Sequence, residues 1–150
     1  AAIRRTTLVQ HWHDQQLARA AVARGAKLVL SPAPKTYLDM KYTRSSPLGL
    51  AWAGTTSVRA AYNWDPATLV DGVGERSVAG VEAPLWSETI STRAGLDHLA
   101  FPRLLGVAEI GWSPAEGRSW REYRQRLATH GPRLDALGVA FHRAPEVPWA

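Results

Sequence analysis

Three short segments of the sequence each place an aromatic ring where a ligand could be bound. Trp12 ends an apolar run, Tyr37 stands two residues before Asp39, and Trp86 stands two residues before Glu88. Side chains alternate between faces in an extended segment, so residues two apart point the same way. An aromatic face covers the C–H face of a pyranose, while a carboxylate accepts hydrogen bonds from its hydroxyl groups. The spacing therefore favours a carbohydrate pocket.

The segments that must position these side chains begin with a strand, a helix and a second strand. Residues 7–12 and 27–30 are short apolar runs of the kind that form buried strands. Residues 14–24 lie between them and carry alanine and leucine at helical spacing. We expect Asp14 to cap this helix at its start and Gly25 to end it.

A third strand is expected over residues 78–86, after a long segment at 34–47 and a short helix over 57–62. Three strands separated by helices predict a parallel α/β sheet with right-handed crossovers. Ligands bind at the carboxyl ends of the strands in such sheets, so the rings and carboxylates should converge there. Three strands are too few for a closed barrel, which needs eight.

Helices dominate the rest of the chain. The pattern predicts one helix over residues 96–112 with Pro102 near its start, and another over 120–137 that is broken at residues 131–132, where a glycine precedes a proline.

Four further residues of the sequence are interpreted as structural. Trp64 and Trp112 are expected to be packing residues. Arg103 and Glu109 are expected to form an ion pair or to be separate surface charges.

Composition narrows the class of protein. With 150 residues, 45% of them hydrophobic and 21% charged, the sequence is typical of one globular domain. It has no cysteine, which excludes disulfides, Cys-ligated zinc and a thiol nucleophile. No run is long enough for a membrane span, and the first residues show no signal-peptide pattern. Seven tryptophans are the unusual feature, and they fit a ligand with flat apolar faces.

Charge and histidine content leave weaker alternatives. The net charge of +5 and pI near 10.1 suit a nucleic-acid-binding domain, but the basic residues are scattered, and those at 118–126 alternate with Glu116 and Glu122. His11 and His13 share a strand face, yet a metal site needs further ligands. We therefore expect no metal, no cofactor and no nucleic-acid partner.

Six short motifs follow one another along the sequence: Val9-Gln10-His11-Trp12, Gly25 before Leu28-Val29-Leu30-Ser31-Pro32, Tyr37-Leu38-Asp39, Leu85-Trp86-Ser87-Glu88, Phe101-Pro102-Arg103-Leu104 and Ala108-Glu109-Ile110-Gly111-Trp112. In this order they resemble glycoside hydrolase family twenty, the β-N-acetylhexosaminidases. The resemblance covers about residues 7–137. It implies that residues 1–150 are the C-terminal part of a (β/α)8 TIM barrel, about strands six to eight with their helices. The single domain would be a glycoside hydrolase catalytic barrel.

The resemblance also implies a mechanism in which the substrate's acetamido oxygen attacks the anomeric carbon. Tyr37 would donate its hydroxyl to the acetamido carbonyl and hold that nucleophile in position. Trp12 and Trp86 would form the walls of the acetamido pocket and exclude water.

Further roles follow from the same resemblance. Asp39 would bind the region of the sugar's 6-hydroxyl, Glu88 the 4-hydroxyl, and Trp52 would close over the 6-hydroxyl end. The family's catalytic Asp–Glu pair has no match in this sequence. The isolated chain is therefore expected to be inactive, and its partner would be the N-terminal half of the barrel.

The predicted function is that of an exo-glycosidase that removes terminal non-reducing N-acetylhexosamine from oligosaccharides or glycoconjugates, chitin fragments among them. The alternatives are a non-catalytic carbohydrate-binding module and, less favoured, a basic nucleic-acid-binding domain. Arginine and alanine usage indicates a bacterial source, and both a secreted and a cytoplasmic location stay open.

Overall fold

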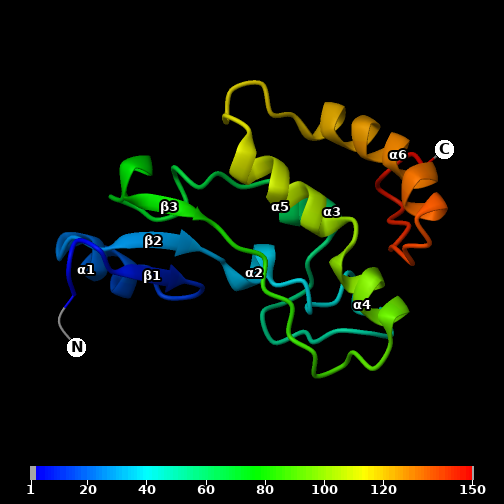
Figure 1. Cartoon of the computed structure of the whole chain (residues 1–150), viewed down its shortest axis with the longest axis horizontal. Coiled ribbons are helices and arrows are strands. Elements are labelled where there is room, and N and C mark those ends of the chain that lie inside the picture. The colour runs from blue at the N-terminus through cyan, green and yellow to red at the C-terminus, as the bar shows by residue number, and fades with distance from the viewer. Residues whose placement is uncertain (1–2, 150) are drawn as a thin grey trace.

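The computed structural model describes residues 3–149. Its strands, β1 (Leu8–His11), β2 (Lys27–Leu30) and β3 (Val78–Val81), form one parallel sheet in the order β1-β2-β3 (Figure 1). The predicted small parallel α/β sheet is confirmed. The register aligns the last residue of each strand, because the final residue of β2 pairs with those of both β1 and β3. All three strands therefore end at one edge of the sheet.

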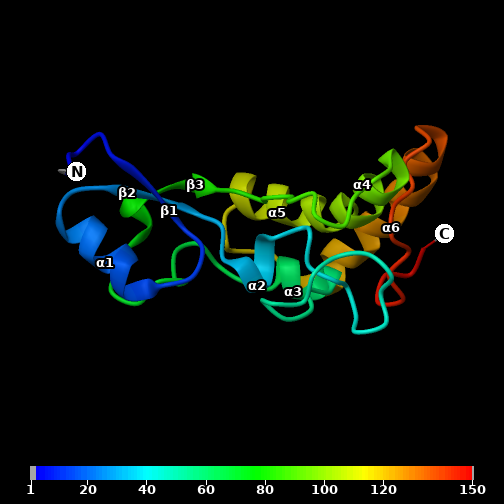
Figure 2. The same ribbon diagram turned by 90° about the horizontal axis from the view of Figure 1, so that it is seen from below.

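Helix α1 (Gln15–Ala23) covers one face of the sheet beside β1 and β2 (Figure 2). The Asp14 carboxylate caps it as predicted, since it accepts hydrogen bonds from the N–H groups of Gln16 at 2.7 Å and Leu17 at 3.3 Å. After the helix, Gly25 adopts a φ of 92°, in the left-handed region where glycine is favoured. Buried side chains from the helix, β2 and the loop after residue 69 form the local core: Ala18, Leu28, Leu30, Val70 and Val73.

The third strand is shorter than the predicted residues 78–86. It ends at Val81, and the Glu82 N–H makes one more hydrogen bond, to the Leu30 carbonyl at 2.9 Å. Pro84 has no N–H to continue a ladder, and its carbonyl accepts instead from the Leu38 N–H at 2.8 Å. The segment that carries Trp86 is thus fastened to a loop rather than to the sheet.

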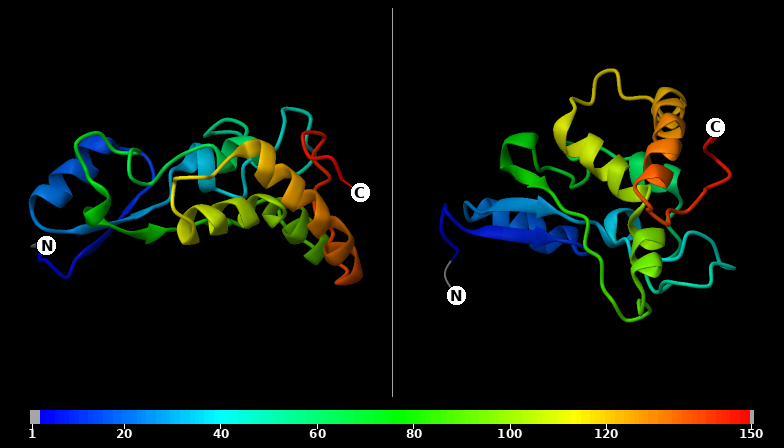
Figure 3. Two further views of the ribbon diagram at one scale, coloured as in Figure 1. Left: turned by 90° about the horizontal axis from the view of Figure 1, so that it is seen from above. Right: turned by 45° about the vertical axis from the view of Figure 1, so that its right-hand side comes forward.

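Most of the remaining elements pack beyond the carboxyl ends of the strands and continue to the C-terminus, whereas the 3-10 helix directly before β3 lies at the amino end of that strand (Figures 1 and 3). In chain order they are α2 (Ala33–Thr36), α3 (Val58–Tyr62), the 3-10 helix η1 (Glu75–Ser77), α4 (Arg93–Ala100), α5 (Arg103–Trp112) and α6 (Trp120–Ala136). Helix α5 contacts β3, α2, α3 and α4, so it joins the sheet to the helical part. Within residues 3–149, no helix combines the length and the apolar character that crossing a membrane requires.

Two helix predictions are wrong. The single helix expected over residues 96–112 is two helices, because Phe101 is extended before Pro102, as residues before proline usually are. The break expected at residues 131–132 does not occur, and α6 runs through Pro132. Its buried residues and the Trp149 ring, which lies against Gly131, supply packing that offsets the missing backbone hydrogen bond.

Of the four side chains interpreted as structural, some agree with the structure and others do not. Trp64 packs against the sheet core and donates its ring N–H to the Ala61 carbonyl, as expected of a packing residue. Trp112 is 91% exposed at the end of α5, so its assignment to packing is wrong. The interpretation of Arg103 as the ion-pair partner of Glu109 or a surface charge is wrong, because Arg103 is fully buried and bonds to backbone carbonyls. Glu109 pairs with Arg126 instead.

Candidate functional site

One cavity of about 420 Å³ gathers all the predicted site residues at the carboxyl ends of the strands. It is lined by Gln10, Trp12, Tyr37, Asp39, Trp52, Trp86 and Glu88. The rings come from four separate segments: the residue after β1, the end of α2, the loop at 49–54 and the segment after β3. The parallel sheet and α2 therefore bring together residues that lie up to 78 positions apart, from Gln10 to Glu88.

Four aromatic rings contact one another around this cavity, in edge-to-face or tilted pairs. The Trp12 and Trp52 ring centroids are 6.2 Å apart and nearly perpendicular, at 82°. Tyr37 lies 5.8 Å from Trp52, also at 82°, and 6.4 Å from Trp86 at a tilt of 47°. These separations lie within the range in which aromatic edges and faces attract. Tyr37 is nearly buried, while the three tryptophans are half exposed, so their faces are available to a ligand.

Asp39 forms a polar floor beneath the rings. Its side chain is buried, and its Oδ1 accepts only one long hydrogen bond, of 3.5 Å, from the Trp86 N–H. Within the described residues its Oδ2 has no hydrogen-bond partner. Burial raises the pKa of this carboxyl above its usual value, and the nearby Glu88 raises it further. A buried acceptor without a partner is costly, so the arrangement suits a ligand that brings a hydroxyl donor.

Tyr37 is held as a hydrogen-bond donor. Burial is the main cause that raises the pKa of its hydroxyl, and the charges of Asp39 and Glu82 add to it. The hydroxyl therefore keeps its proton throughout the neutral range. A protonated phenol beside a wall of tryptophan rings can bind a carbonyl oxygen inside an apolar pocket.

The loop that carries Trp52 is fixed to the backbone of Asp39. The Leu50 N–H donates to the Asp39 carbonyl at 2.8 Å, and the Lys41 N–H donates to the Leu50 carbonyl at 2.8 Å. Gly49 permits this approach, because it has a φ of 97° and a Cβ there would lie 2.7 Å from the Asp39 carbonyl oxygen. The start of the Trp52 loop is therefore anchored to the backbone of Asp39.

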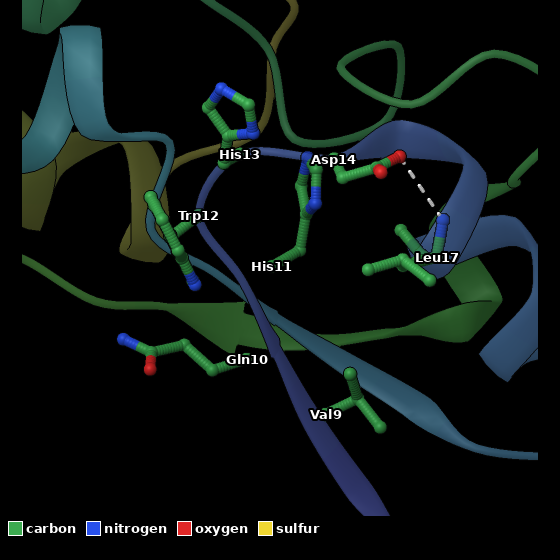
Figure 4. A pocket seen from close by; sticks show the side chains of 8 residues that line it. Val9, Gln10, His11, Trp12, His13, Asp14 and Leu17 are labelled. Carbon is green, nitrogen blue, oxygen red and sulfur yellow. Dashed lines mark hydrogen bonds between the residues drawn. The ribbon is translucent and has the colours of Figure 1, made fainter. Parts of the chain in front are cut away.

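Gln10 lines the cavity and was not predicted as a site residue. Its side-chain amide donates to the Ser31 hydroxyl at 2.9 Å and to the Glu82 carboxylate. In Figure 4, Gln10 and Trp12 extend to one side of β1, while Val9 and His11 extend to the other. The alternation that placed Trp12 at the site would have placed Gln10 beside it.

The opposite side of β1 has a separate cavity of about 250 Å³, which Figure 4 shows from close by. It lies between β1 and the start of α1 and includes His11, Asp14 and Leu17. Burial lowers the pKa of His11. Across residues 3–149, no three His, Cys, Asp or Glu residues are grouped closely enough to hold a metal ion.

Comparison with known proteins decides the family. The sequence model described as "Glycosyl hydrolase family 20, catalytic domain" matches residues 1–115. The chain belongs to glycosyl hydrolase family 20. A curated relative, the β-N-acetylhexosaminidase of Cellulomonas fimi, is 42% identical over 146 residues, which are 95% of this chain and 29% of the relative.

Solved structures of family 20 enzymes agree. The β-N-acetylhexosaminidase of Streptomyces coelicolor A3(2) superposes with a TM-score of 0.92 at 50% identity, over 95% of this chain and 30% of that one. A mutant β-hexosaminidase of Streptomyces plicatus, solved in complex with its product GlcNAc, matches with the same score, identity and coverage. The catalytic domain of the family is a TIM barrel, and this chain spans less than a third of these relatives' length.

Proposed function

We propose that this family 20 chain is the C-terminal part, about strands six to eight, of the catalytic barrel of a β-N-acetylhexosaminidase. The enzyme would remove terminal non-reducing N-acetylhexosamine from oligosaccharides or glycoconjugates. This chain would supply the sugar pocket. The rest of the barrel would supply the catalytic Asp–Glu pair, in which the Glu is the general acid and base and the Asp orients the acetamido nitrogen, and it would be the chain's principal partner.

The observation that carries the proposal is the cavity itself. Three half-exposed tryptophans surround it, and the buried Asp39 carboxylate at its floor has an unpartnered oxygen. Apolar rings around a buried acceptor suit a pyranose, which presents C–H faces together with hydroxyl donors. The volume of about 420 Å³ lies in the range of ordinary small-molecule pockets.

Each side chain then has a role in substrate-assisted hydrolysis. Trp12 and Trp86 enclose the acetamido group, and the Tyr37 hydroxyl donates to its carbonyl oxygen. That oxygen attacks the anomeric carbon as the bond to the leaving group breaks. Because Tyr37 is packed between Trp52 and Trp86, the nucleophile is held near its target and little entropy is lost at the reacting step.

The remaining polar contacts read the sugar's hydroxyl groups. Asp39 accepts from the 6-hydroxyl and Glu88 from the 4-hydroxyl, while Trp52 covers the 6-hydroxyl end. Both carboxylates line the same cavity as the rings. A substrate without these hydroxyls would leave the buried Asp39 oxygen unpaired, which disfavours its binding.

The test is release of the aryl group from an aryl N-acetyl-β-glucosaminide by the complete enzyme, with the plain aryl β-glucoside as the control. Turnover of the first substrate alone is the expected result. Equal turnover of both would refute the proposal, since the Tyr37 pocket serves only the acetamido group. Saturable binding of an N-acetylglucosamine-derived thiazoline without turnover would favour the carbohydrate-binding module instead.

A further inference from the structure

Arg103 is a buried cation whose hydrogen bonds all go to the backbone of other segments or of the preceding helix. It is the first residue of α5, directly after the N-cap residue Pro102, and it is 0% exposed. Its guanidinium nitrogens donate to four carbonyl oxygens, those of Met40 at 2.7 Å, Thr56 at 3.1 Å, Leu99 at 2.8 Å and Leu38. No other side chain of the described residues makes so many contacts with the main chain.

Two of these carbonyls flank Asp39. The Leu38 and Met40 carbonyls point to Arg103, while the Asp39 carbonyl between them accepts from the Leu50 N–H. The Leu38 N–H in turn bonds to the Pro84 carbonyl, at the start of the segment that carries Trp86. The backbone around Asp39 is therefore hydrogen-bonded to three other parts of the chain, namely Leu50, Pro84 and the Arg103 side chain.

The charge of Arg103 is balanced without a salt bridge to a carboxylate. Burial lowers the pKa of its guanidinium, and the neighbouring Tyr42 and Asp39 oppose that shift. The Tyr42 ring lies beneath the guanidinium, 3.8 Å from its central carbon, in a cation–π contact. The four carbonyl dipoles and this ring keep the cation in one orientation.

We propose that Arg103 is a positioning residue for substrate recognition, which fixes the Asp39 carboxylate where the sugar's 6-hydroxyl binds. The inference rests on the proposed function and adds a residue that does not touch the cavity. Arg103 acts through the Leu38 and Met40 carbonyls, so its removal displaces Asp39 more than it alters the rings of the pocket.

A lysine at this position cannot replace the arginine. Its ammonium is a compact group with three donors, whereas the planar guanidinium serves four carbonyls in one fixed fork. Arg103→Lys keeps the charge, leaves at least one of the four carbonyls without a partner and frees the Leu38–Met40 backbone to shift. A displacement of about 1 Å at a positioned group costs on the order of 100-fold in rate.

The experiment compares two substrates in the complete enzyme, an aryl N-acetyl-β-glucosaminide and its 6-deoxy counterpart. Arg103→Lys is expected to lower kcat/KM for the first by about 10- to 100-fold and for the second by no more than about threefold. The 6-deoxy sugar lacks the 6-hydroxyl that Asp39 would bind, so its turnover should not depend on the position of the Asp39 carboxylate. Equal losses for the two substrates, or no loss for either, would overturn the positioning role.

Two further variants complete the test. Arg143→Lys, at an exposed arginine that pairs with Asp135, is the matched control and should leave both substrates unaffected. If Arg103→Lys does not fold, Tyr42→Leu removes the ring that orients the guanidinium. The hydrogen bonds from Arg103 to the Leu38 and Met40 carbonyls should then weaken, and the loss should again be larger for the sugar with a 6-hydroxyl than for the 6-deoxy sugar. A wild-type enzyme without preference for the acetamido sugar would refute the proposed function itself, whereas equal Arg103→Lys losses in a selective enzyme refute only the positioning.

Discussion

Removal of one oxygen atom tests the proposed role of Tyr37 most directly. Tyr37→Phe keeps the ring that packs between Trp52 and Trp86 and deletes only the hydroxyl. Because the residue is 6% exposed and the ring contacts persist, the fold should be little affected. Any change in activity then reports on the hydrogen bond to the acetamido oxygen.

The size of the decrease in activity distinguishes two possible roles of that hydrogen bond, in substrate binding or in stabilising the transition state. A neutral hydrogen bond made equally to bound substrate and transition state contributes about 0.5–1.5 kcal/mol, which is roughly 2- to 12-fold and would appear in KM. A buried donor on the oxygen that becomes the nucleophile acts on charge that changes during the reaction, and its loss costs about 100- to 1,000-fold in kcat. The burial of Tyr37 favours the larger effect, so we expect a decrease of about 100-fold in kcat with KM changed less than about threefold.

The assay is steady-state hydrolysis of an aryl N-acetyl-β-glucosaminide by the complete enzyme between pH 5 and pH 8. The raised pKa of Tyr37 keeps its hydroxyl protonated over this window, so the loss should be the same at each pH. Tyr62→Phe, which deletes a hydroxyl bonded to Glu109 outside the cavity, is the control. A Tyr37→Phe enzyme within about threefold of wild type in kcat would refute the reasoning.

Three other predictions follow from the same contacts. Gly49→Ala should lower the free energy of unfolding, measured by urea denaturation, by about 3–5 kcal/mol. Gly54→Ala is the control and should cost about 1–2 kcal/mol, because Gly54 has a similar positive φ but open space around it. Equal losses would count against the clash with Asp39. Burial lowers the pKa of His142 to about 4, so the folded state binds fewer protons than the unfolded state between about pH 4 and pH 6.5. Stability should therefore fall, by on the order of 2 kcal/mol, as pH drops through that window, and His142→Phe should reduce this dependence in thermal unfolding. Trp112 is almost fully exposed beside an open hollow along β3, so the isolated chain should self-associate. Trp112→Ser should shift the mass measured by light scattering towards that of the monomer. An unmutated isolated chain that is already monomeric would contradict this.

The sequence was sufficient to predict the parts of the fold that depend on local patterns. The strand at residues 27–30 was predicted with its observed bounds, because Leu28 and Leu30 alternate with outward residues and are bounded by Gly25 and Pro32. Convergence of Trp12 and Trp86 followed from the parallel sheet, since the carboxyl ends of its strands meet at one edge. Both inferences use one-dimensional patterns with a known period.

Long-range compensation was not predictable in this way. Pro132 signals a break, and only the packing of Trp149 and the buried face of α6 explains why the helix continues. Arg103 is similar, because arginine on a helix is usually a surface charge, and the carbonyls that bury it lie up to 65 positions away in the sequence. No local pattern carries that information.

The exposure of the rings distinguishes a ligand site from an ordinary core. A tryptophan that merely packs tends to be covered by its neighbours, and Trp64, which follows α3, is partly buried against the sheet core, since burial of large apolar surface is favourable. Trp12, Trp52 and Trp86 stay 44%, 56% and 51% exposed, although all three line one cavity. The residue buried beneath them is a carboxylate, the group that is most costly to bury without a partner. Folding alone favours the reverse arrangement, with the rings covered and Asp39 in water, so this part of the chain is best explained by a ligand that covers the rings and donates to Asp39.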